Sequence, residues 1–175
     1  MKTQYSESIT WETVTNSEEE LTIYKWVDSD GTEHCFTFEE NSFSKYDKYG
    51  LRLSLLNITN SNCLEIHDKE SNIKRFIKYP ETTSMEQCAL LSCIMDAYGN
   101  KIVFRYEQIS FGRVAVTSIG IQPNRSEEIP YFEFEYYSLG NLYEIKNLAN
   151  DRKVTLEYSS DFTSSKVSIT YAKAG

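Results

Sequence analysis

The sequence contains little proline and glycine and no long apolar run. It has 3 prolines and 7 glycines among 175 residues, but 13 tyrosines and 9 phenylalanines, and 40% of the chain is apolar. Such a composition excludes a collagen-like chain and is not that of a disordered one. No apolar run reaches the roughly 18 residues of a membrane-spanning helix, and residues 1–14 lack the apolar stretch of an export signal. We therefore expect no membrane partner and no signal peptide in this chain.

The chain also lacks a cluster of basic residues. Its net charge is −8, its lysines and arginines are scattered, and its longest run of one sign is the acidic Glu18–Glu20. Proteins that bind nucleic acids or anionic surfaces normally present a basic face. We therefore exclude nucleic acid from the expected partners.

Metal-binding spacings are missing too. The sequence holds four cysteines and two histidines, at Cys35, Cys63, Cys88, Cys93, His34 and His67. Zinc ligands usually come in pairs about two to four residues apart, and none of these cysteines forms a CxxC pair. The adjacent His34 and Cys35 would point to opposite faces of a strand. We expect unpaired, half-buried cysteines and no metal ion or cofactor, while the redox compartment stays open.

Motifs of hydrolases and phosphate-binding proteins do not occur. The sequence has no GxSxG, no HExxH and no glycine-rich phosphate loop, and nothing in it places a histidine beside a cysteine as a nucleophilic pair requires. Glu133 and Glu135 share one face of an alternating segment, which could suit sugar hydrolysis, but such pairs more often form the solvated face of a strand. We expect no catalytic residue in this chain.

What the sequence does contain is a repeated turn. Four stretches share the frame D-x-x-[GS]-x, a fifth keeps Gly-Asn after a tyrosine, and a sixth is degenerate; they are residues 28–32, 47–51, 68–72, 96–100, 137–141 and 147–151. An Asp side chain can accept a hydrogen bond from the backbone N–H two residues on, and Gly or Asn tolerates the positive φ of hairpin turns. We assign this structural role, without any ligand, to Asp28, Gly31, Asp47, Gly50, Asp68, Asn72, Asp96, Gly99, Asn100, Gly140 and Asn141.

One of these turns imitates the start of a calcium loop. Asp28, Asp30 and Gly31 have the spacing of its first ligands. The loop also needs a bidentate Glu as its twelfth residue, and here that residue, Glu39, follows a predicted strand with the sequence HCFTF. We therefore interpret residues 28–32 as another repeat turn.

Alternation of period two flanks the turns and predicts strands with one buried face. Phe132, Phe134 and Tyr136, for example, alternate with glutamates. We predict an all-β chain of repeated antiparallel β-hairpins that form a curved, partly rolled sheet. It is one domain, 1–175, with a lead-in over 1–20 and hairpin repeats over 21–171.

Three segments need separate predictions. We expect a strand over 89–95 and allow a helical turn around 82–88 because of its helix formers and a capping-box-like Ser84. The prolines at positions 80, 123 and 130 indicate loops over 80–88 and 120–130. Open sheet edges pair readily with other chains, so we expect self-association or a covering loop formed by residues 107–130.

Three stretches closely resemble the YD repeats of the Rhs family: YDKYG (46–50), DAYGNKIVFRY (96–106) and YYSLGNLYEI (136–145). The stretch WVDSDGTEHCFTF (26–38), followed by YDKYGLRLSL (46–55), is similar to the segment that opens the repeats in wall-associated Gram-positive members. The resemblance covers roughly residues 20–171.

The resemblance implies a structural role. In such proteins long arrays of hairpins coil into a β-sheet shell around a C-terminal toxin, secreted or held at the cell wall. Partners would then be neighbouring repeats of a longer parent protein, or a second copy paired through open edges. This chain has only about six turns and no RVxxDPxG-like motif, so we expect it to be a segment of a longer array.

The alternative is a module that binds cell-wall glycans. Exposed aromatic rings on a flat sheet can stack on sugars, and the candidates are Trp11, Trp26, Tyr131 and Tyr143. The competing interpretation is that these rings form the core or cover a sheet edge.

Overall fold

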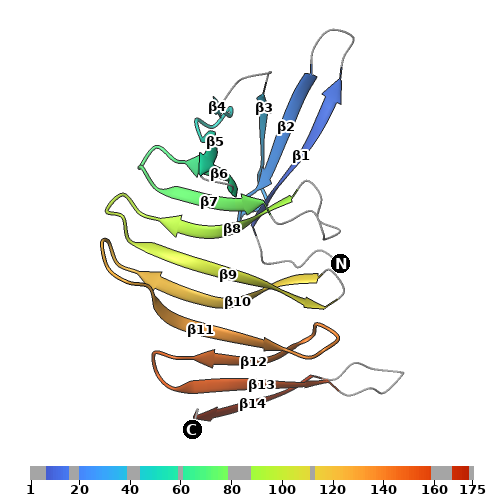
Figure 1. Cartoon of the computed structure of the whole chain (residues 1–175), viewed down its shortest axis with the longest axis vertical. Coiled ribbons are helices and arrows are strands. Elements are labelled where there is room, and N and C mark those ends of the chain that lie inside the picture. The colour runs from blue at the N-terminus through green and yellow to red at the C-terminus, as the bar shows by residue number, and fades with distance from the viewer. Residues whose placement is uncertain are drawn as a thin grey trace. The chain divides into compact units, whose positions relative to one another are not determined.

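A computed structural model describes residues 7–15, 20–38, 44–58, 61–78, 88–110, 113–158 and 167–173. These residues form strands and turns and no helix, so the prediction of an all-β antiparallel chain is confirmed. The described part accordingly includes no apolar helix of the length that crosses a membrane. The chain divides into two compact units, unit 1 with residues Met1–Lys101 and unit 2 with residues Ile102–Gly175 (Figure 1).

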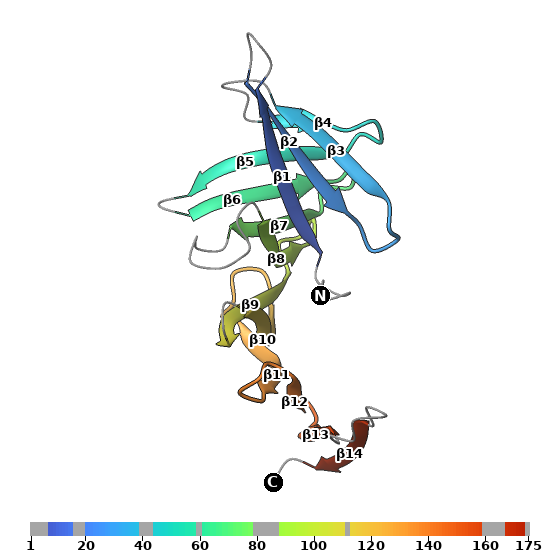
Figure 2. The ribbon, with the colours of Figure 1, turned by 90° about the vertical axis from the view of Figure 1, so that its right-hand side faces the viewer.

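Unit 1 is a rolled antiparallel sheet. Its strands are β1 (Ser8–Thr15), β2 (Glu20–Val27), β3 (Glu33–Phe38), β4 (Ser44–Tyr46), β5 (Arg52–Ile58), β6 (Ser61–His67), β7 (Ile73–Lys78) and β8 (Cys88–Met95). They lie in the order β3-β2-β1-β8-β7-β6-β5-β4. Figure 2 shows β1 to β3 running across β5 to β7, so the sheet folds back over itself.

The roll depends on the first strand. Ile9 lies opposite Trp26 of β2 on one side and opposite Ala89 of β8 on the other, so β1 joins two hairpin series that are distant in the sequence. The lead-in assigned to residues 1–20 therefore contains a strand that is central to the sheet. The sequence did not predict this strand because its residues are mostly polar, and only Ile9 of β1 is buried.

The inner face of the roll forms the core. Phe36, Leu53, Leu64, Phe76 and Ile9 are each at most 1% exposed. They come from five different strands, and burying each contributes about 1.5–3 kcal/mol. Strand β3 shows the origin of the pattern, since its side chains alternate between exposed and buried along all of Glu33–Phe38.

Unit 2 is a meander of strands that follow one another in the sheet. They are β9 (Lys101–Ser110, whose first residue belongs to unit 1), β10 (Arg113–Gln122), β11 (Ile129–Tyr136), β12 (Leu142–Asn147), β13 (Arg152–Tyr158) and β14 (Val167–Lys173). Strand β8 confirms the prediction for 89–95. The predicted loop over 80–88 and helical turn over 82–88 lie outside the described residues, except for Cys88, which begins β8.

Of two loop predictions in unit 2, one was wrong and the other is confirmed only in part. The proposed covering loop, 107–130, consists mainly of the end of β9 and the whole of β10, whose β-branched residues favour a strand. The predicted loop 120–130 shrinks to residues 123–128. Pro130 lies within β11, opposite Gly120, where a register shift between Ile119 and Gly120 interrupts the pairing. A bulge is a place where a sheet tolerates proline.

The two faces of unit 2 differ in polarity. One row of cross-strand neighbours is apolar, with Phe134, Ile145, Val154 and Tyr171. The opposite face carries ion pairs, such as Lys153 with Glu144 at 3.1 Å. All buried apolar side chains of the described residues belong to unit 1, whereas Ile169 and Tyr171 are 52% and 76% exposed. The described residues of unit 2 therefore present an apolar face and form no buried apolar core.

Candidate functional site: capped turns and a buried histidine

Four aspartates cap their turns in the same way. In residues 96–100 the Oδ1 atom of Asp96 accepts hydrogen bonds from the N–H groups of Tyr98 and Asn100, both at 2.9 Å. Asp28, Asp47 and Asp68 accept the equivalent pair of bonds in their own turns. The fourth residue of each turn has a positive φ, which is 89° at Gly99. This pattern is typical of a type I turn followed by a residue in the left-handed conformation. The geometry agrees with the capped turns expected from the D-x-x-[GS]-x frame.

The structure corrects the role of the asparagines that end two of these turns. Neither Asn72 nor Asn100 is among the residues with positive φ, which the preceding Ser71 and Gly99 adopt instead. Each asparagine donates its side-chain N–H to the second oxygen of the turn aspartate at 2.8 Å. The Asn100 bond is the main cause of the lowered pKa of Asp96. These asparagines therefore serve the carboxylate, not the backbone angle.

The remaining turns close without an aspartate cap. Tyr137 and Asn141 are joined by a backbone bond of 2.8 Å, and Gly140 has a φ of 84°. In 147–151 the side chain of Asn147 accepts the N–H of Ala149 at 3.0 Å. A further turn, at 123–126, was not predicted as a repeat turn because it begins with proline and lacks the frame.

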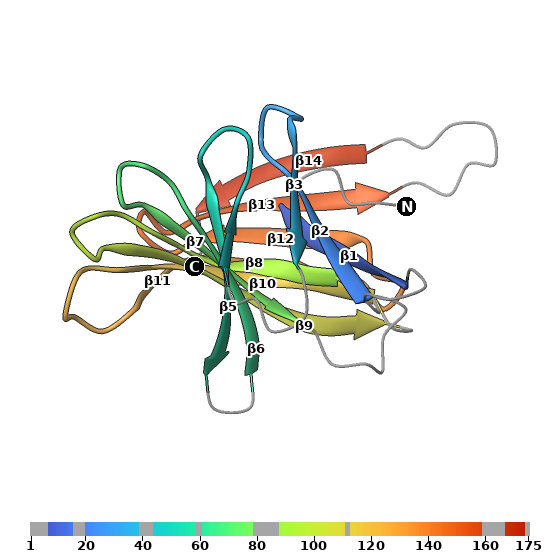
Figure 3. The same cartoon turned by 90° about the horizontal axis from the view of Figure 1, so that it is seen from above.

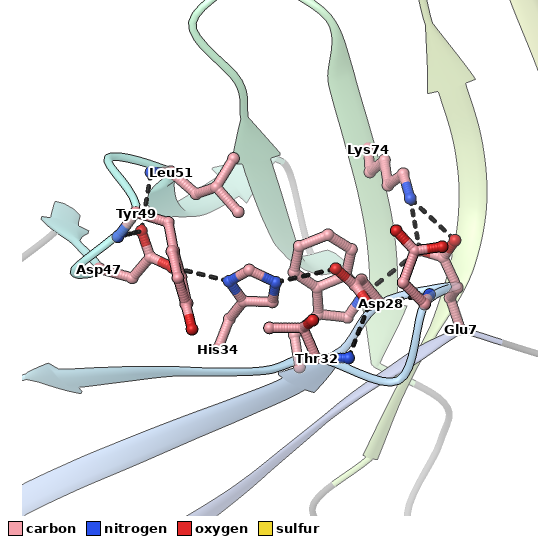
Figure 4. Close-up of polar contacts among 10 residues, drawn as sticks. Glu7, Asp28, Thr32, His34, Asp47, Tyr49, Leu51 and Lys74 are labelled. Atoms are coloured by element: carbon pink, nitrogen blue, oxygen red, sulfur yellow. Dashed lines mark hydrogen bonds and ion pairs between the residues drawn. The ribbon is translucent and has the colours of Figure 1, made fainter.

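Four turns of unit 1 lie at the same end of its strands, and Figure 3 shows them spread out like a fan; they are residues 28–32, 47–51, 68–72 and 96–100. Two of them meet at His34. The ring of His34 is 5% exposed, with Nδ1 at 2.7 Å from Asp47 Oδ2 and Nε2 at 3.1 Å from Asp28 Oδ2 (Figure 4). Carboxylates only accept hydrogen bonds, so the histidine ring is the donor in these contacts. His34 thus joins β3 to the turn between β4 and β5.

Aromatic rings enclose this histidine. Trp26 stacks on it with 4.7 Å between ring centroids, and Tyr49 contacts it edge-on at 5.2 Å. The indole N–H of Trp26 donates to Glu7 at 3.2 Å, and Lys74 pairs with that carboxylate at 2.7 Å. We define Asp28, His34, Asp47, Trp26 and Tyr49 as the His34 cluster.

The glycan-stacking candidates do not form one surface. Trp26 is only 5% exposed, so its prediction as an exposed sugar platform was wrong, because the ring packs inside the His34 cluster. Trp11 is half-buried under the ammonium of Lys78, 4.3 Å from its ring. Tyr131 and Tyr143, both half-buried in unit 2, contact Phe132 and Tyr137 respectively.

The chemistry around His34 is that of a structural contact. The neighbouring Cys35 lies on the opposite, exposed face of β3, as expected from strand alternation. Desolvation, together with the nearby Glu33, raises the pKa of its thiol, which disfavours the nucleophilic thiolate. Hydrogen bonding to His34 is the largest cause of the lowered pKa of Asp28. Both aspartates already use their other oxygen in a turn cap.

The four cysteines are free thiols. Cys63 and Cys93 are buried, and burial raises their pKa, whereas Cys35 is exposed. Half-burial, as predicted, holds only for Cys88. Across the described ranges, no three His, Cys, Asp or Glu side chains are arranged to hold a metal ion. The two nitrogens of His34 face different aspartates, so the three groups do not converge on one point.

The His34 cluster had a signal in the sequence. His34 alternates with Phe36 and Phe38 in EHCFTF, which places it on the apolar face. A buried polar side chain needs hydrogen-bond partners, but their identity depends on how β3 meets a turn 13 residues away. Paired buried glutamates, Glu65 with Arg75 and Glu144 with Lys153, were missed for the same reason.

The fold and the site together define an all-β chain built of capped hairpin turns. No protein-family model matches this chain, and no curated protein matches it.

Proposed function

We propose that this chain is a structural segment of a YD/Rhs-type repeat protein, secreted or associated with the bacterial cell wall. It contributes strands to a β-shell that encloses or presents a C-terminal toxin, and it has no catalysis of its own. The observation that carries this proposal is the apolar face of unit 2, which has no buried apolar side chain among its described residues. Repeat units that cannot bury their apolar face alone must stack on neighbours.

The repeat turns support the same role. In the four aspartate turns the Oδ1 atom is used twice by the backbone of its own turn. At Asp28, Asp47, Asp68 and Asp96 the second oxygen is also engaged, by His34 or by an asparagine. Carboxylates that are hydrogen-bonded in this way stabilise the hairpin turns and have few acceptor positions left for a ligand.

The partners of this segment would be neighbouring repeats of a longer parent protein. When such neighbouring repeats are absent, the apolar face can be covered by a second copy of the chain. Adjacent residues of β14 offer a matched test of this association. Ile169 lies on the apolar face opposite Leu156, and Thr170 lies on the other face opposite Thr155, and both are exposed.

The experiment is sedimentation velocity of the chain and of two variants over a range of concentrations. The wild type should associate as concentration rises, Ile169→Lys should shift it toward the monomer, and Thr170→Lys should behave like the wild type. A wild-type protein that stays monomeric throughout, or equal effects of both lysines, would contradict the proposal.

A glycan-binding module makes a different prediction. It would bind purified peptidoglycan in a pull-down, and with Trp26 buried the binding should depend on Trp11, Tyr131 or Tyr143. A structural segment should show no such binding. Retention on peptidoglycan that is lost in Trp11→Ala would favour the glycan-binding function over the structural one.

A further inference from the structure

A row of four side chains crosses the outer part of unit 1 near two of its turns. Tyr46 of β4 lies opposite Arg52 of β5, Arg52 opposite His67 of β6, and His67 opposite Ile73 of β7. Directly paired residues project from the same face of a sheet. The row therefore has a guanidinium and an imidazole at its centre and an aromatic or apolar side chain at each end.

This row lines a pocket between the turns 47–51 and 68–72. The pocket has a volume of about 320 Å³ and also contacts Lys69 and Asp68. That volume is at the small end of the range of about 300–1,000 Å³ for small-molecule sites. The pocket is thus large enough for a small organic molecule.

Two cations of the pocket have no ion-pair partner among the residues that the structure describes. Within the described residues, the structure records no ion pair or hydrogen bond for the side chains of Arg52 and Lys69. Asp68 also faces the pocket, but its two oxygens accept bonds from the N–H groups of Glu70 and Asn72 and from the Asn72 amide. The positive charges of Arg52 and Lys69 therefore remain available to a ligand, whereas the Asp68 carboxylate beside them is already hydrogen-bonded.

His67 is held in place from the next row of the same face. Its Nε2 atom lies 3.1 Å from Glu65 Oε2, and the other oxygen of Glu65 accepts bonds from Arg75 at 2.6 and 2.8 Å. The Glu65 carboxylate is thus shared between His67, which lines the pocket, and Arg75, whose positive charge offsets it. This arrangement fixes the imidazole beside Arg52.

The Lys69 side chain passes close to Gly50. The side chain of Lys69 crosses the neighbouring turn so closely that a Cβ atom at position 50 would lie 2.7 Å from its Cε atom. Gly50 also has a φ of 82°, which favours glycine. The two turns are therefore packed so that the Lys69 ammonium reaches the pocket.

We propose that this pocket binds a small organic oxyanion, a carboxylate or a phosphate monoester. The planar guanidinium of Arg52 can hold two oxygens of either group, and Lys69 adds a second positive charge. Tyr46 and Ile73 flank the anionic centre and would contact the organic part of the ligand. The site is independent of the His34 cluster, which lies on the buried face.

The test is a titration of the full chain with phenyl phosphate, with benzoate and with the uncharged benzyl alcohol, followed by amide chemical shifts. Saturable shifts in residues 46–52 and 67–73 are expected for one or both anions, and not for benzyl alcohol. Which anion binds then identifies the oxyanion class. Arg52→Gln should weaken binding about tenfold, the usual effect of losing a charge-assisted bidentate contact.

Two further variants keep the result interpretable. Arg152→Gln removes the same charge from an exposed position in unit 2 and should leave the affinity within about twofold of the wild type. Lys69→Gln changes an exposed turn residue, so it tests the pocket even where Arg52→Gln perturbs the fold. Binding of benzyl alcohol as strong as that of the anions would overturn the proposal. So would absent saturable shifts, or equal losses in Lys69→Gln and Arg152→Gln.

Discussion

Gly99 shows what a single residue contributes to a repeat turn. Its φ of 89° lies in a region that side chains with a Cβ atom occupy at a cost of about 1–2 kcal/mol. The neighbouring Ala97 belongs to the same turn and is exposed, but its φ is not positive. The backbone constraint therefore falls on only one of the two small residues of this turn.

Replacing Gly99 by Val should lower the free energy of unfolding by about 1–2 kcal/mol, because the β-branched side chain cannot relax at positive φ. Ala97→Val adds a similar volume in the same turn and should change stability by no more than about 0.5 kcal/mol. Urea denaturation of the two variants measures both values. Equal losses would show that the turn tolerates bulk poorly for some reason other than its backbone angle.

Carboxylates in the turns predict how stability depends on pH. The pKa of Asp28 is lowered by its bond with His34, and that of Asp96 by its bond with Asn100. At Asp68 burial would raise the pKa, but bonds from Asn72 and the backbone outweigh it and the pKa is lowered. A carboxylate whose pKa is lower in the folded state stabilises that state fully when the pH is above its ordinary pKa of 3.8. This stabilisation is lost as the pH falls through the lower pKa of the folded state.

Unfolding free energy should therefore be constant near neutral pH and fall between about pH 5 and pH 2. Asp68→Asn should reduce the steepness of that fall, since an uncharged side chain at position 68 no longer links folding to protonation. Asp30→Asn changes an exposed aspartate that caps no turn and should leave the curve unaltered. Chemical denaturation at a series of pH values gives the slopes, and an Asp68→Asn curve parallel to the wild type would refute the linkage.

For single residues, the sequence predicted which side chains cap the turns but not which role each asparagine has in them. The D-x-x-G frame is sufficient to predict Asp96 and Gly99, because both act on their own turn. Asn100 was expected to supply a backbone angle and instead bonds the carboxylate. Both roles suit an asparagine, so spacing alone does not separate them.

Between elements, His34 is the contact that spans the two ends of the unit 1 sheet. Strands β3 and β4 stand at opposite ends of the strand order, yet His34 of β3 lies 2.7 Å from Asp47 at the end of β4. The side chain of Asp47 is 2% exposed. Removing the ring would leave this carboxylate buried without its partner.

His34→Ala should therefore destabilise unit 1 by about 1–3 kcal/mol, the usual cost of leaving a buried polar group without its hydrogen-bond partner. Thr37→Ala lies on the exposed face of the same strand and should cost no more than about 0.5 kcal/mol. Adding Asp47→Asn to His34→Ala should recover part of the loss, because it removes the unpaired charge. Thermal unfolding of these variants decides; a His34→Ala protein as stable as Thr37→Ala would contradict the role of the cluster.

Strands were predictable where the alternation was strong and local. The alternating FEFEY lies in β11, and the apolar run ALLSCIM, which does not alternate, was predicted as a strand because it leads directly into the turn at 96–100. Proline at 130 misled the prediction because a bulge opposite Gly120 accommodates it, and a bulge has no signature in a single strand. Strand β1 was missed because its partners, β2 and β8, make it a strand through pairing rather than through its own apolar pattern.

For the whole molecule, burial separates the two units. Unit 1 folds back on itself and encloses a core that includes Phe36 and Phe76. Unit 2 spreads its apolar side chains over one face of a meander, where the described residues include no buried apolar side chain. Composition predicted enough apolar residues for a core, but not that they would be distributed so unevenly.

Hydrogen exchange of the isolated chain at low and high concentration tests the central claim most directly. Local protection follows buried contacts, so amides of β6 to β8 should exchange slowly at both concentrations. Amides of β11 to β13 should exchange at least about tenfold faster at low concentration and become protected as copies associate. If β11 to β13 are as protected as β6 to β8 in a monomeric sample, unit 2 needs no neighbour, and the structural-segment account is contradicted.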